Sequence, residues 1–207
     1  MSSFKTGLLI LFVPPDGFRA IKRDRDHFRW VGPIVLYLLT VAARVFNIFF
    51  TSYPLRSQAP EETNFLQVIL TVLVPLMLWV VGCYLVTTIL SGESMFREVF
   101  AATSYAALPA VILTVPLTLM SKVLSSTSAG VYQILWVVVF MWCGLLALIG
   151  ISVMNSYSIK KTLAVTGISL FACVFLVTII ALLYVLGMRV VNFVQEVISE
   201  YRLLLVG

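Results

Sequence analysis

The sequence predicts an all-helical membrane protein, a bundle of about five transmembrane helices with an interfacial amphipathic segment at each end. Three observations lead to this fold class. Of the 207 residues, 61% are hydrophobic and only 11% are charged, whereas a soluble domain carries about 25% charged residues. Five apolar runs each reach the length of about 20 residues that a helix needs to cross the bilayer. The excess positive charge is concentrated at the start of the chain, beside the first run.

Residues 1–30 are predicted to form a cytoplasmic leader that is not cleaved. Its apolar start, residues 4–13, is too short to span the bilayer and should lie at the interface. A proline turn follows, after which Asp16 is expected to cap a short amphipathic helix. The apolar face of this helix holds Phe18, Ile21 and Phe28.

The other face of the leader helix is basic. We expect it to contact the headgroups of anionic lipids, although an ordinary solvated leader fits the pattern equally well. The expected headgroup contacts are Arg19, Lys22, Arg23 and Arg25.

Five apolar runs make up the predicted transmembrane domain, residues 31–188. Polar residues and turn formers cluster between the runs, and none of these connections is long enough for another domain. Pro109 and Pro116 interrupt the third run, where we expect a kink rather than a failure to span. The runs are Val31–Thr51, Phe65–Leu90, Phe100–Leu119, Val131–Met154 and Thr162–Met188.

The distribution of lysine and arginine predicts the orientation of the bundle. With five alternating spans, the leader and the connections after the second and fourth spans lie on one side, and that side carries most of the basic residues. Basic residues favour the cytoplasmic side, so the N-terminus should be inside and the C-terminus outside. Residues 189–207 should then form an outer amphipathic tail that lies along the membrane or packs on a partner. The expected tail contacts are Glu196, Glu200 and Tyr201.

Arg44 is the most informative residue of the predicted spans. A polar stripe surrounds it on one face of the first span, and no aspartate or glutamate lies within any predicted span. An arginine in hydrocarbon costs about 2.5–3.5 kcal/mol on insertion scales, so it needs a partner or a wet cavity. Three interpretations remain open: pairing with an outer glutamate (Glu61, Glu62, Glu196 or Glu200), contact with a partner protein, and a transport or ligand site. The stripe consists of Tyr37, Thr40, Arg44, Asn47 and Thr51.

No constellation for catalysis or metal binding is found in the sequence. The lone histidine, His27, lies in the charged leader, and the motifs of metalloproteases, serine hydrolases and phosphate-binding loops are absent. The three cysteines, at positions 83, 143 and 173, lack metal-ligand spacing. We therefore expect no enzyme activity, no catalytic residue, no metal and no cofactor. Anionic lipid rather than nucleic acid is the expected counterion of the basic leader.

Two passages of the sequence resemble the Yip family, the Ypt-interacting integral membrane proteins, in its bacterial short-leader branch. They are LFVPPDGFRAIKRDRDHFRWVGPI at residues 11–34 and SGESMFREVFAATSYAALPAVI at residues 91–112. The resemblance implies a cytoplasmic leader followed by about five spans. It also implies structural roles for four residues before and within the third span. A glycine makes the turn, an aromatic residue anchors the interface, a tyrosine follows, and a proline kinks the helix. These residues are Gly92, Phe96, Tyr105 and Pro109.

The resemblance also bears on location and partners. The leader motif of the eukaryotic relatives that bind Rab-type GTPases is absent here, so GTPase binding is not expected. The short leader points to a multi-pass protein of the bacterial cytoplasmic membrane. Some bacterial relatives resemble companions of sugar-importing ABC systems, which implies a transporter permease as a partner.

Three hypotheses of function follow. The first is a non-enzymatic membrane adaptor or accessory subunit that associates with another membrane protein. The second is a small permease or lipid-handling protein with a polar site around Arg44, which requires a cavity at that residue and is contradicted by solid packing around it. The third is membrane shaping by the two amphipathic ends.

Overall fold

The computed structural model describes residues 3–24, 29–55, 63–124 and 129–206, and this part of the chain is helical without strands. Five helical stretches are long and apolar enough to cross a membrane, which confirms the predicted all-helical, five-span fold class. A short 3₁₀ turn, Tyr53–Leu55, follows the first span. The helices are α1 (Ser3–Phe12), α2 (Pro14–Arg23), α3 (Val31–Phe50), α4 (Phe65–Ile89), α5 (Phe96–Ala106), α6 (Leu108–Met120), α7 (Ala129–Asn155) and α8 (Ile159–Val206).

The third span differs most from its expected form. It runs from Phe96 to Met120 and is divided into α5 and α6 at Ala107. The division has a local cause, because Pro109 lacks the amide N–H that would continue the helical hydrogen bonds across this point. The expected kink is therefore present, and the segment remains long enough to span. The span also begins earlier than predicted and includes the fully buried Glu98, so the expectation of spans without acidic residues is wrong here.

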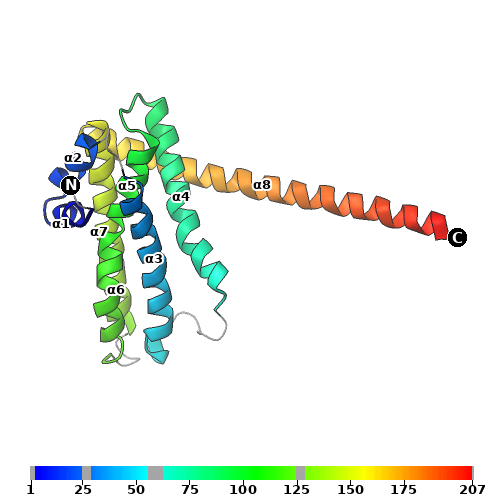
Figure 1. Ribbon diagram of the computed structural model, residues 1–207, viewed down its shortest axis with the longest axis horizontal. Coiled ribbons are helices and arrows are strands. Elements are labelled where there is room, and N and C mark those ends of the chain that lie inside the picture. The colour runs from blue at the N-terminus through cyan, green and yellow to red at the C-terminus, as the bar shows by residue number, and fades with distance from the viewer. Residues whose placement is uncertain (1–2, 25–28, 56–62, 125–128, 207) are drawn as a thin grey trace.

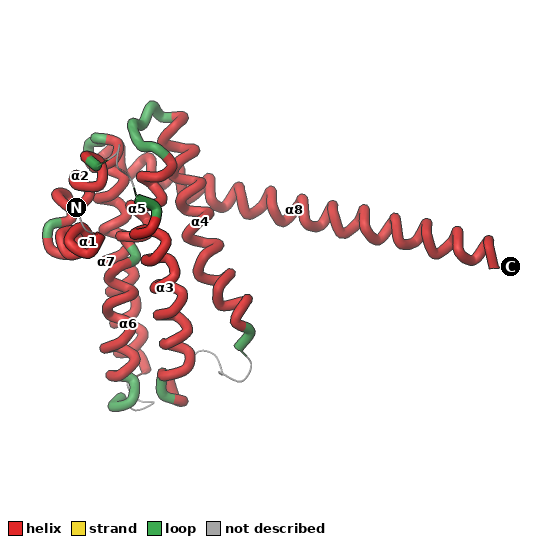
Figure 2. The backbone as a smooth tube through the Cα atoms, in the orientation of Figure 1, coloured by secondary structure: helices red, strands yellow, loops and turns green. Residues whose placement is uncertain are grey.

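The spans form an open bundle that differs at its two ends. Figure 1 shows α3, α6 and α7 side by side, with α5 continuing the line of α6. The N-terminal end of α4 leans away from α3. We call the end at which α2 meets the α4–α5 and α7–α8 loops the leader end. The opposite end, where α3 and α6 terminate, is the Arg44 end. Figure 2 shows loops at both ends and helices between them.

The leader packs on the protein as a helical hairpin. Ile10 and Phe18 are fully buried in a cluster with residues of α5 and α7. Gly17 allows the two helices to approach closely, since a Cβ atom there would lie 2.7 Å from the backbone nitrogen of Ile10. The expected capping role of Asp16 is wrong: α2 begins at Pro14, and Val13 precedes it as the cap residue. The expected apolar face is thus buried against the bundle, except for Phe28, which lies outside the described residues.

The last span, α8, leaves the bundle. It is one continuous helix of 48 residues, and Figure 1 shows it running away from the other spans with the C-terminus far from them. Its main contact is with α4, where a Cβ atom on Gly82 would lie 2.6 Å from Cys173 Sγ. Every residue from Val177 to Glu196 is exposed, so this stretch packs on nothing else in the described chain.

Candidate functional site

A cavity of about 840 Å³ lies between α3, α4, α6 and α7 toward the Arg44 end. This volume is within the range of about 300–1,000 Å³ that is usual for ligand sites. Four of the five residues in the predicted polar stripe line it: Thr40, Arg44, Asn47 and Thr51. The fifth, Tyr37, is buried elsewhere, and its hydroxyl donates to the carbonyl of Phe100 at 3.2 Å.

Asn47 connects Arg44 to the neighbouring helices. Its amide nitrogen donates to the hydroxyl of Thr118 on α6 at 3.1 Å and to that of Tyr132 on α7 at 3.2 Å. Both bonds use the N–H₂ group, so the amide oxygen is turned toward Arg44, whose Nη1 donates to it at 3.3 Å. The three-helix contact therefore holds Asn47 in place and orients the guanidinium at the cavity wall.

Of the described residues that line the cavity, Arg44 is the only one with a charged side chain. Two ion pairs of the described chain, Arg19–Asp16 and Lys22–Glu93, lie at the leader end, and neither includes Arg44. Of its expected partners, Glu61, Glu62 and the side chain of Glu200 lie outside the described part. Glu196 belongs to the exposed stretch of α8, and Figure 1 shows that helix running away from α3. Among the described residues Arg44 bonds to Asn47 and not to Glu196.

Most other polar side chains of the cavity are satisfied within their own helices. The hydroxyls of Thr40, Thr71 and Thr114 donate to carbonyls four residues earlier, at 2.8, 2.7 and 2.6 Å. Such internal bonds leave little for a ligand. Within the described chain, the lining side chains other than Asn47 that carry N–H groups are those of Arg44 on α3 and of Gln133 and Trp136 on α7.

The rest of the cavity wall is apolar. It includes Val72 and Leu76 on α4, Val111 on α6, and Trp136 and Phe140 on α7. The wall is open on one side, because α4 packs on α3 and α6 packs on α7 while α4 and α7 do not pack substantially on each other. One cationic group therefore faces an apolar space that opens sideways between two spans.

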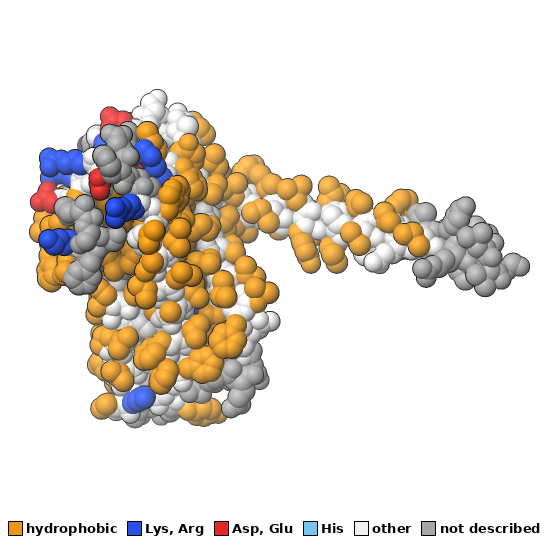
Figure 3. Space-filling view, in the orientation of Figure 1, with side chains coloured by type: hydrophobic (Ala, Val, Ile, Leu, Met, Phe, Trp, Pro, Cys, Tyr) orange, Lys and Arg blue, Asp and Glu red, His pale blue; other side chains and the backbone are white. Residues whose placement is uncertain are grey.

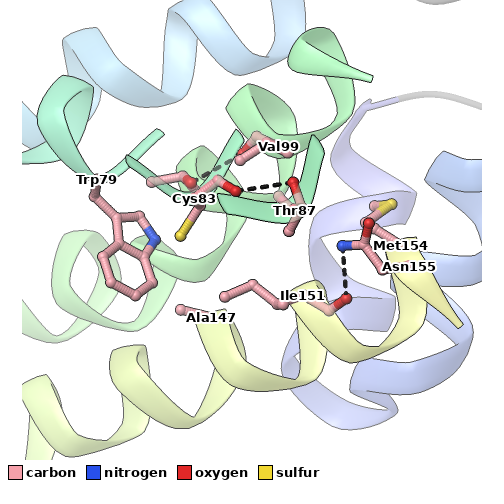
Figure 4. Close-up of a pocket in the computed structure, with 11 residues that line it drawn as sticks. Trp79, Cys83, Thr87, Val99, Ala147, Ile151, Met154 and Asn155 are labelled. Carbon is pink, nitrogen blue, oxygen red and sulfur yellow. Dashed lines mark hydrogen bonds between the residues drawn. The ribbon is translucent and has the colours of Figure 1, made fainter. Parts of the chain in front are cut away.

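The leader end is closed by contrast. Figure 4 shows a space at the junction of α4, α5 and α7, and its volume is only about 10 Å³, which is about enough for one water molecule. The Asn155 side chain donates to the carbonyl of Ile151 at 3.1 Å and accepts the N–H of Ser94 at 3.1 Å. It thereby ties the end of α7 to the loop before α5.

Of the four family-like residues, Gly92 lies at this junction, and the other three belong to the third span. Gly92 is needed for close contact rather than for backbone conformation: a Cβ atom there would lie 2.4 Å from Asn155 Oδ1, and the positive φ of the turn, 55°, falls on Ser91. Phe96 is partly exposed and meets the ring of Tyr84 edge-on, with centroids 5.5 Å apart. Tyr105 is buried, and Pro109 lies at the start of α6.

The expected headgroup residues have different surroundings. Lys22 reaches into the junction, and its Nζ donates to Glu93 Oε2 at 2.8 Å and to Ser156 Oγ at 2.9 Å. Arg19 pairs with Asp16 at 2.8 Å on the exposed face of α2. Figure 3 shows charged side chains gathered over the leader end and a largely hydrophobic surface elsewhere. Headgroup contact stays a prediction for Arg19 and for the exposed Arg23, while Arg25 lies outside the described residues.

Two further polar residues near the junction were not predicted, the buried Glu98 and the partly buried Tyr157. The carboxylate of Glu98 accepts the N–H of Met95 at 2.9 Å and so completes the first turn of α5. An acidic residue three positions after the start of a helix is a known signal of this arrangement. Burial, together with the carboxylate of Glu93, raises the pKa of Tyr157 above its usual value, and its phenol donates to the carbonyl of Leu90 at 3.3 Å.

A comparison with protein families gives the chain its family. A model of the Yip1 domain matches residues 8–182. The chain belongs to the Yip1 domain family. The matched region begins within α1, contains the rest of the leader hairpin, the bundle and the cavity, and ends within the exposed part of α8. The Yip1 assignment confirms the resemblance at the level of the family. No curated protein and no solved structure matches the chain significantly.

Proposed function

We propose that this Yip1-domain protein is a non-enzymatic lipid-handling protein that binds an anionic membrane amphiphile in the Arg44 cavity. One observation carries the proposal: among the described residues, Arg44 is the only charged side chain lining a cavity of about 840 Å³ between four spans. Solid packing around Arg44 would have favoured a purely structural role. We propose a bacterial cytoplasmic membrane as its location, and the basic residues of the leader end support an orientation with the N-terminus inside.

The chemistry of the cavity selects the class of ligand. A guanidinium binds phosphate and carboxylate groups through a planar fork of N–H donors. The apolar wall formed by Val72, Leu76 and Phe140 suits an acyl chain. A bound anion would also offset the cost of holding an arginine inside the hydrocarbon layer. A phospholipid with an anionic headgroup satisfies both halves of the site.

Native mass spectrometry of the full chain tests this function. The protein in mild detergent is titrated with phosphatidylglycerol or with phosphatidylcholine, and the lipid bound per chain is measured. We expect preference for phosphatidylglycerol and a loss of about tenfold in its affinity in Arg44→Gln, since a charge-assisted hydrogen bond contributes about 1.5–3 kcal/mol. Arg44→Lys should retain part of the preference.

Lys122→Gln is the matched control for Arg44→Gln. It removes one positive charge at the same end of the bundle, but Lys122 lies over the ring of Phe50 and does not line the cavity. Equal losses in the two variants, or equal binding of the two lipids by the unaltered protein, would contradict the proposal. Inorganic phosphate as competitor separates recognition of a free anion from recognition of a lipid.

A second candidate function, association with another membrane protein, is favoured by α8. The residues of this helix from Val177 to Glu196 are exposed on every side, and small or apolar residues predominate among them. We propose a permease subunit of an ABC-type importer as the partner. A photoreactive residue at Leu183 should yield an adduct that peptide sequencing identifies as a permease, whereas adducts with lipid alone would count against this role.

A further inference from the structure

We propose that the N-terminal half of α4, Phe65–Leu76, is a lateral entrance to the Arg44 cavity, with Pro75 as its hinge. The acyl chain of the ligand would enter from the bilayer between α4 and α7. This inference rests on the proposed function, because it concerns how the same ligand reaches the same site.

The two halves of α4 are held very differently. In the C-terminal half, Val80 and Cys83 are fully buried, and Gly82 brings α8 so close that a Cβ atom would lie 3.3 Å from the carbonyl oxygen of Ser169. This half is also packed on α5 through the cluster that contains Val99. It is therefore a fixed support.

The N-terminal half has few contacts by comparison. Its residues are mostly exposed, with Val68 as the buried exception. At its start, the ring of Phe65 stacks on that of Phe49 at the end of α3, with centroids 6.0 Å apart. Figure 1 shows this half diverging from the bundle. Among the described residues, the Phe65–Phe49 stack and the buried Val68 are thus the contacts that hold this half-helix near its start.

Pro75 lies at the boundary between these halves and at the cavity. It has no amide N–H, so the helical hydrogen bond to the carbonyl of Thr71 is absent. Thr71, Val72 and Leu76 are the residues of α4 that line the cavity. The missing hydrogen bond therefore lies in the stretch that forms the cavity wall, where a bend changes the width of the opening.

The opposite edge of the opening is on α7. Gln133, Val137 and Phe140 line the cavity and are exposed. Both edges belong to transmembrane spans, so the opening faces lipid rather than water. Arg44 lies six residues before the end of α3, about 9 Å along the helix. A headgroup that reaches this depth brings its acyl chains into the hydrocarbon layer, where the opening lies.

Lipid exchange tests the entrance separately from binding. The full chain is loaded with chain-deuterated phosphatidylglycerol and mixed with an excess of the unlabelled lipid, and native mass spectrometry follows the exchange. Pro75→Ala restores one helical hydrogen bond of about 1 kcal/mol, so we expect exchange to slow about fivefold at unchanged occupancy. Pro116→Ala in α6 is the matched control, since Pro116 is exposed and does not line the cavity.

A second pair of variants keeps the test independent of the proline. Val137→Trp narrows the edge of the opening and should slow exchange, whereas Val138→Trp adds the same bulk at an exposed position of α7 that does not line the cavity. Exchange at the unaltered rate in both Pro75→Ala and Val137→Trp, with full occupancy, would overturn the entrance and leave the proposed function intact. Failure of the unaltered chain to bind phosphatidylglycerol would overturn both.

Discussion

The leader end and the Arg44 end of the bundle are built from the same spans but are packed in opposite ways. At the leader end, α2 and the loop before α5 close the junction, and the remaining space is about 10 Å³. Toward the Arg44 end, four spans enclose about 840 Å³. The leader end is therefore closely packed, whereas the Arg44 end leaves a space, which is the ligand site that we propose.

The largest effect on the free energy of unfolding is expected from Phe18→Ala at the leader end. Phe18 is fully buried against α7, with Cε1 3.3 Å from the position of a Cβ atom on Gly150. Truncation of a buried phenylalanine costs about 3–5 kcal/mol, and we expect a loss at the low end of that range in the free energy of unfolding in mixed micelles. Phe12→Ala, at a position that is 80% exposed, should change it by less than about 0.5 kcal/mol. Equal effects would contradict the docked leader.

A smaller loss in the free energy of unfolding is expected from Gly92→Ala. The added Cβ atom would lie 2.4 Å from Asn155 Oδ1 and 2.8 Å from the carbonyl oxygen of Thr87, so the loop before α5 has to move. Overpacking of this kind costs about 1–3 kcal/mol. Gly144→Ala is the control, because a Cβ atom there meets nothing within 4 Å and helix propensity favours alanine by about 0.5–1 kcal/mol. Thermal unfolding of the two variants should therefore shift in opposite directions.

Periodicity and hydropathy predicted the fold because each span satisfies its own backbone hydrogen bonds, so a span is a local property of the sequence. Pro109 predicted the kink for the same reason. The start of the third span was missed, since Arg97 and Glu98 end the apolar run although the helix begins at Phe96. The burial of Glu98 depends on contacts with other segments, which no local pattern contains.

The candidate site was predicted only in part. The spacing of Arg44 and Asn47 placed both residues on one face of the first span, and both line the cavity. The hydrogen-bond partners of Asn47, Thr118 and Tyr132, come from two other spans. The cavity itself arises because α4 leans away from α3, which is a matter of helix packing rather than of composition. The contacts of Lys22 could not be predicted either, because its partners, Glu93 and Ser156, lie in two loops that are distant in the sequence.

Lys22→Met should weaken the leader end only slightly. Its ion pair with Glu93 joins side chains that are 25% and 61% exposed, and exposed pairs contribute less than about 1 kcal/mol. The loss in the free energy of unfolding should shrink at high salt because the ion pair is screened. Arg23→Met removes a charge from the same helix without a contact to the junction and should have no comparable effect. A loss that persists at high salt would show that the contact with Ser156 dominates.

The smallest effect on stability is expected from Arg44→Leu, although this change should abolish preferential binding of the anionic lipid. Within the described chain, Arg44 makes one hydrogen bond, at 3.3 Å to Asn47, and removal of its charge relieves the cost of about 2.5–3.5 kcal/mol for an arginine in hydrocarbon. The free energy of unfolding should therefore stay equal or rise.

Asn47→Leu is the matched change in the same network. It leaves the buried hydroxyls of Thr118 and Tyr132 without the amide that donates to them, at a cost of about 1–3 kcal/mol. Measurement of both variants in mixed micelles without added lipid separates the two roles. If Arg44→Leu lost as much stability as Asn47→Leu, Arg44 would be a structural residue, paired with a carboxylate such as Glu61 or Glu62. The Arg44 end would then be held together by charge in the way that the leader end is held together by packing.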